Sequence, residues 1–96
     1  MIHQVILSEN TVNMTIKDLD YLAREVWVLS WGLVGMQPDG TQIAVGSSLG
    51  LSIKVSRTTE GYSVAILCHG QCIGLSGAPD LTAVIRFIDH KLNEMI

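Results

Sequence analysis

LSIKVSRTTEGYSVAILC, residues 51–68, is the stretch that decides the fold. Its first half alternates, with Leu51, Ile53 and Val55 on one side and Lys54 between two serines on the other. Such alternation is typical of a half-buried β-strand. The polar tip RTTEG predicts a turn into YSVAILC, which is again apolar and rich in β-branched residues. The stretch therefore predicts two antiparallel strands.

The segment CHGQC (68–72), which begins at the last residue of this stretch, contains both cysteines and one of the three histidines. They predict a further hairpin, for which three registers are open: a His69-Gly70 loop, a bulged Cys68–Gly70 loop, or a His69–Gln71 loop. Only the last places the two sulfurs opposite one another. The first is favoured, because histidine tolerates a positive φ and because this register unites four apolar residues on one face. These are Val64, Ile66, Ile73 and Leu75.

Before this meander, the sequence predicts a helix that starts at Thr15, with Asp18 completing a capping box three residues later. Apolar residues recur at helical spacing up to Val26, and the helix is expected to continue to about residue 31, with Gly32 as its stop. A competing interpretation makes residues 27–36 a strand, because they are β-branched and aromatic.

The C-terminal helix has the clearest pattern. Pro79 fits its first turn, and Asp80 complements the helix dipole there. An apolar stripe at helical spacing follows, made of Leu81, Val84, Ile85, Ile88, Leu92 and Met95.

Two shorter signals complete the predicted fold. HQVIL (3–7) predicts a short strand, and QPDGT (37–41) predicts a turn into the strand TQIAVG. Together the patterns predict one α+β domain over residues 1–96, with the order β-α-β-β-β-β-α. Its mainly antiparallel sheet of five or six strands is expected to carry both helices on one face.

Composition narrows the classes of function. Hydrophobic residues make up 48% of the 96 residues and charged residues 16%, with a net charge of −3. This excludes a disordered chain, and no basic stripe is present for direct binding of nucleic acid. No apolar run reaches the roughly 20 residues of a membrane span, and no signal peptide is recognised. We therefore expect a cytoplasmic protein with free thiols.

Few residues in the sequence indicate a catalytic or metal-binding site. No pattern indicates a catalytic pair of acids or an activated nucleophile, so we expect neither an enzyme nor a cofactor. A competing hypothesis is a thiol or zinc site at Cys68, His69 and Cys72, although structural zinc usually takes four ligands from paired knuckles. Cysteines buried as small hydrophobic residues are the favoured interpretation. A small-molecule pocket between sheet and helices is a third hypothesis.

From Val26 to Ile53 the only charged residue is Asp39, and from Gly61 to Pro79 there is none when histidine is counted as neutral. These uncharged stretches favour another role. A lone molecule of this length has little polar surface with which to cover them, and large exposed apolar patches usually mark interaction sites. We expect a non-catalytic protein-binding module, either a homodimeric accessory protein or a small inhibitor or adaptor. Inhibitors of host defence encoded by phages and mobile elements are one such class. The predicted contacts are Trp27, Val28 and Trp31, then the polar tip from Arg57 to Glu60. The alternative interpretation is that both tryptophans are ordinary core residues.

Overall fold

Five strands follow one another along the chain and pair in the same order in space. The computed structural model describes residues 11–35 and 41–95, and their sheet order is β2-β3-β4-β5-β6, with the short β1 paired to β4. Every pair is antiparallel, which confirms the predicted α+β class and antiparallel sheet. The elements are β1 (Thr11–Val12), α2 (Ile16–Glu25), β2 (Ser30–Gly35), β3 (Gln42–Ser48), β4 (Leu51–Thr58), β5 (Gly61–Cys68), β6 (Gln71–Ala78) and α3 (Leu81–Glu94).

The predicted order is wrong in one respect, because five strands rather than four lie between the helices. Helix α2 ends at Glu25 instead of about residue 31, and Ser30–Gly35 forms the edge strand β2, as the competing interpretation had it. A helix through this apolar segment would expose apolar side chains all round. In the strand, Trp31 and Leu33 pack against the core. The strand predicted at 3–7 and the turn residues 37–40 lie outside the described residues.

Both helix starts are set by side-chain caps. At α2, Thr15 is the N-cap: its hydroxyl accepts from Asp18 N at 3.1 Å, and Asp18 Oδ2 accepts from Thr15 N at 3.3 Å. This confirms the predicted capping box. At α3, the N-cap is Asp80, which accepts from Ala83 N at 2.9 Å. Pro79 therefore precedes the cap and does not lie in the first turn, where it was predicted.

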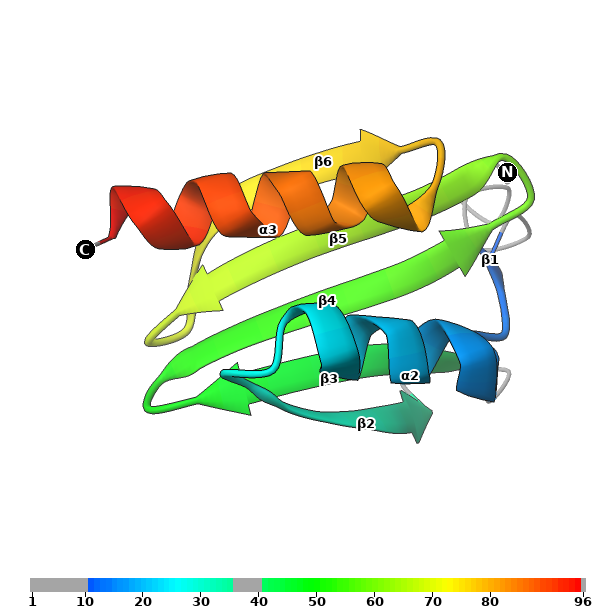
Figure 1. Cartoon of the computed structure of the whole chain (residues 1–96), viewed down its shortest axis with the longest axis horizontal. Helices are drawn as coiled ribbons and strands as arrows, with labels where there is room; N and C mark the ends of the chain where they lie inside the picture. The colour runs from blue at the N-terminus through cyan, green and yellow to red at the C-terminus, as the bar shows by residue number, and fades with distance from the viewer. Residues whose placement is uncertain (1–10, 36–40, 96) are drawn as a thin grey trace, which may run out of the picture.

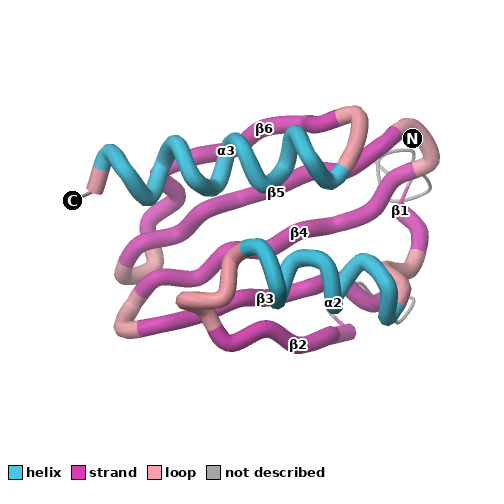
Figure 2. Tube along the Cα trace, viewed as in Figure 1, coloured by secondary structure: helices cyan, strands magenta, loops and turns pink. Residues whose placement is uncertain are grey.

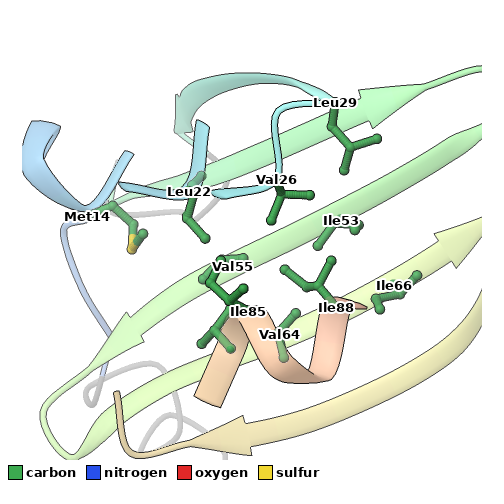
Figure 3. Close-up of a cluster of buried hydrophobic side chains, with 12 residues drawn as sticks. Met14, Leu22, Val26, Leu29, Ile53, Val55, Val64, Ile66, Ile85 and Ile88 are labelled. Carbon is green, nitrogen blue, oxygen red and sulfur yellow. The ribbon is translucent and has the colours of Figure 1, made fainter. Parts of the chain in front are cut away.

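The core lies between the sheet and the helices. Figures 1 and 2 show α2 and α3 side by side in front of the sheet, both beginning at the end where β4 turns into β5. Figure 3 shows side chains of both helical segments converging on strands β4 and β5. The fully buried members of this cluster include Leu22, Val84 and Ile88 from the helices and Ile53, Val55, Val64 and Ile66 from the strands.

A bulge in β6 changes which residues face this core. The two-residue His69-Gly70 loop pairs Cys68 with Gln71 as favoured, and His69 has a φ of 51°. The register then shifts, so that Ile66 pairs with Gly74 and Ala65 with Leu75. Because one extra residue moves the following side chains to the other face, the expected apolar face is wrong. Leu75 lies on the uncovered face, 72% exposed.

Candidate functional site

A groove of about 520 Å³ lies where the two helices end. One wall comes from the end of α2 and the segment after it, with Glu25, Val26, Trp27 and Val28. The other wall comes from the last turns of α3, with Asp89, Leu92, Asn93 and Met95. The volume falls within the roughly 300–1,000 Å³ typical of ligand pockets.

The segment after α2 exposes two large apolar side chains. Val26 caps the helix, with its N–H donating to Leu22 O at 2.8 Å, and Leu29 N donates back to Val26 O at 3.4 Å. Val26 and Leu29 are buried in the core. The tight turn directs the two residues between them outward, so Trp27 is 77% and Val28 53% exposed.

Trp31 holds this segment against the sheet. Its indole Nε1 donates to Val26 O at 2.9 Å, and its ring lies over Gly46 of the neighbouring strand. A Cβ at position 46 would lie only 2.6 Å from Trp31 Cε2. Only glycine leaves room for the ring here. Trp31, predicted as a partner contact, is thus half-buried and positions the segment that carries Trp27 and Val28.

Among the described residues, the two charged ones that line the groove are both acids. Glu25 and Asp89 line opposite walls, and the carbonyl ends of both helices add partial negative charge at this end. Arg24 approaches Glu25 at 3.9 Å, but both side chains are well exposed, so this pair is weak. The groove therefore combines an apolar surface with negative charge at its sides.

The other predicted contacts lie at the opposite end of β4. Arg57 and Glu60 line a second hollow, of about 450 Å³, around the turn between β4 and β5. Arg57 Nη1 contacts Asp18 Oδ2 at 3.1 Å, and Tyr62 donates its hydroxyl to Asp18 Oδ1 at 3.2 Å. Burial, and then the charge of Asp18, raises the pKa of Tyr62 above 10.0. Arg57 is thus partly engaged within the molecule, and the predicted contacts divide between two ends.

The three residues of the competing site do not converge. Cys68 pairs with Gln71, and Cys72 pairs with Leu67, so alternation along the strands directs the two sulfurs to opposite faces. Cys68 is half-buried and Cys72 exposed, which corrects the expectation that both are buried. The His69 ring lies against Gly50 of the adjacent hairpin turn. Within residues 11–35 and 41–95, no group of three His, Cys, Asp or Glu residues is placed to hold a metal ion.

Sequence reasoning missed the contribution of α3. Leu92 and Met95 belong to the apolar stripe predicted for the C-terminal helix. Leu92 packs against the core, yet both residues line the groove, and Met95 is 45% exposed. The different lengths of the two helices explain why the end of α3 lines the groove. Helix α3 has 14 residues and α2 has 10, and both begin at the same end of the sheet (Figure 1). The last turn of α3 therefore faces the segment after α2 instead of another helix.

Comparisons of the chain with family models, with curated proteins and with solved structures find no match. Neither of the two described helices has the length and apolar composition needed to cross a membrane.

Proposed function

We propose that the protein is a cytoplasmic, non-catalytic protein-binding module that works as a small inhibitor or adaptor, and that the groove at the helix ends is its main contact surface. The observation that carries the proposal is the exposure of Trp27 and Val28 beside this groove. Tryptophan buries a large area on binding and is enriched among the residues that dominate interface energies. Inhibition of a host defence system is one role that such a module could serve.

The way Trp27 is held supports a binding role. Its segment has both flanking apolar residues, Val26 and Leu29, in the core, and Trp31 donates to the Val26 carbonyl. A segment that is already ordered loses little conformational freedom when a partner binds. The exposed ring is therefore presented by a fixed backbone.

The test compares wild-type protein with variants that each change a single surface of the molecule. Wild-type protein, a Trp27→Ala/Val28→Ser variant and a Leu75→Ser control are immobilised and exposed to a lysate of the cells in which the protein is made. Leu75 is nearly as exposed as Trp27 but lies on the uncovered face of the sheet. A captured protein is then purified, and its Kd is measured for each variant.

The proposal expects a purified partner that binds wild type and Leu75→Ser equally and binds the groove variant at least about tenfold more weakly. If no partner depends on Trp27 and Val28, the groove is not the contact surface. A Cys68→Ser/Cys72→Ser variant separates the competing thiol or zinc hypothesis, since loss of binding in that variant alone would favour it.

Self-association is tested separately by light scattering. A homodimer would give a mass near twice 10.4 kDa. If the mass is that of one chain at high concentration, the partner is a different protein.

A further inference from the structure

We infer that the groove receives a basic and apolar segment of the partner: an apolar side chain that packs between Trp27 and Met95, and a nearby Lys or Arg that pairs with Glu25 and Asp89. This inference rests on the proposed function and adds the chemistry of the partner. It follows from the apolar side chains and the two carboxylates that line the groove beside Asn93.

The apolar part follows from the surface left uncovered. Val26 is buried beneath the groove, while Trp27, Val28 and Met95 remain 77%, 53% and 45% exposed. The groove is small for a protein surface and suits a few consecutive residues. One apolar side chain inserted there would remove surface of all three residues from water, which is the dominant favourable contribution in most protein associations.

The basic part follows from charge complementarity. Glu25 and Asp89 lie on opposite walls, so a cation that enters the groove has a carboxylate on either side. The cation of α3 nearest in sequence to these walls is Lys91, which contacts Glu94 at 3.5 Å and lies against Gly74 of β6. Lys91 therefore lies on the β6 side of the helix and is not among the residues that line the groove. The negative ends of the two helix dipoles favour a cation at the same place.

The same charges disfavour a second copy as the occupant. In a twofold dimer each copy presents the same surface to the other. A dimer that covers the groove would bring Glu25 and Asp89 of both copies into one interface, where like charges repel. A basic segment of a different protein meets no such repulsion.

The experiment selects ligands without assuming a partner. The full chain, immobilised through a biotin tag, is used to select binders from a phage-displayed library of random dodecapeptides. A Glu25→Lys/Asp89→Lys variant is used in a parallel selection. An Asp20→Lys/Gln71→Lys/Thr82→Lys variant makes the same change in net charge at exposed positions away from the groove walls, and serves as the matched control.

The expected result is that wild-type binders share an apolar residue close to Lys or Arg. As synthetic peptides, they should bind Trp27→Ala at least about tenfold more weakly. Charge reversal in the groove should weaken them further and select acidic peptides instead, whereas the control variant should keep the wild-type preference. Affinity for wild type should fall as salt concentration rises.

Three results would overturn the inference. Peptides that need Trp27 but contain no basic residue would leave the proposed function intact and refute the partner chemistry. Peptides that ignore Trp27, or a selection that enriches none, would refute the groove as a site for such segments, while partner capture tests the proposed function independently. A dimer of the chain that Trp27→Ala dissociates would show that a second copy is the occupant.

Discussion

The two ends of the helical layer differ in whether their side chains are bonded within the molecule or left exposed. At the end where both helices begin, Asp18 is almost buried and accepts from Thr15, Arg57 and Tyr62. At the end where both helices finish, Trp27 and Val28 are exposed and their carboxylate neighbours line an open groove. The first end joins α2 to the sheet by polar contacts, and the second leaves apolar surface for a partner. Stability and binding should therefore respond to different substitutions.

The largest effect is expected from Asp18→Ala. The substitution leaves the Arg57 guanidinium, the Tyr62 hydroxyl and the Thr15 N–H without their carboxylate acceptor. Removing one partner of a buried pair costs about 3–5 kcal/mol, and the half-exposed Arg57 reduces this to about 2–3 kcal/mol of unfolding free energy. Urea unfolding measures the change. Asp20→Ala, an exposed acid on the same helix, should change stability by less than about 0.5 kcal/mol. Equal effects of the two substitutions would contradict the role assigned to Asp18.

At the opposite end, Gly46→Ala should cost about 2 kcal/mol, because the new Cβ would overlap the Trp31 ring. In a Trp31→Leu background the same substitution should cost little or even stabilise, since alanine restricts the unfolded chain more than glycine does. Gly32→Ala is the control, because nothing lies within 4 Å of a Cβ at that position. Chemical unfolding of wild type, Gly46→Ala, Trp31→Leu and the double variant measures the coupling. A cost that is independent of Trp31 would show that the ring is not what excludes a side chain.

The residues in these two predictions also show which parts of the fold can be predicted from the sequence. Local patterns sufficed for the capping box at Thr15, for the alternation of β4 and for the His69-Gly70 loop. They did not suffice for residues 27–35, where helix and strand are both compatible with an apolar segment. There, the pairing of β2 with β3 and the fit of Trp31 over Gly46 settle the outcome, and these contacts are distant in sequence.

The candidate site was predictable in part. Trp27 and Val28 were among the predicted contacts, with a core position as the alternative for Trp27, and the structure exposes both. The second wall of the groove was not expected, because α3 shows one unbroken apolar stripe and the stripe does not indicate where its neighbours end. The exposure of Leu75 was also unpredicted, because the bulge that reverses its face has no marker in the sequence beyond Gly74 itself.

A smaller effect is expected from Tyr62→Phe, and it should depend on pH. Loss of the hydroxyl that donates to Asp18 should cost about 1 kcal/mol near neutral pH. Because burial and the charge of Asp18 raise the pKa of Tyr62, the folded chain keeps this phenol proton at pH values where the unfolded chain has lost it. This contribution to stability is complete below pH 10.0 and is lost as the pH rises through the folded pKa.

Urea unfolding is measured at a series of pH values from about two units below the free phenol pKa to about one unit above it. The series separates the contribution of the hydrogen bond from the contribution of the phenol ionisation. Wild type should lose stability more steeply above pH 10.0 than Tyr62→Phe does. Titration of other groups affects both proteins alike and cancels in the difference. Parallel curves for the two proteins would show that Tyr62 ionises equally well in the folded and unfolded states.

The smallest effect on stability is expected at the residue with the largest expected effect on binding. Trp27 is 77% exposed, so Trp27→Ala removes little buried surface and should change the unfolding free energy by less than about 0.5 kcal/mol. Trp31→Ala, which removes the indole that bonds to Val26 O, should cost more than about 2 kcal/mol by the same urea measurement. The contrast separates a tryptophan that faces a partner from one that supports the fold. If Trp27→Ala were as destabilising as Trp31→Ala, the ring would belong to the core, and the groove would not be a surface kept free for binding.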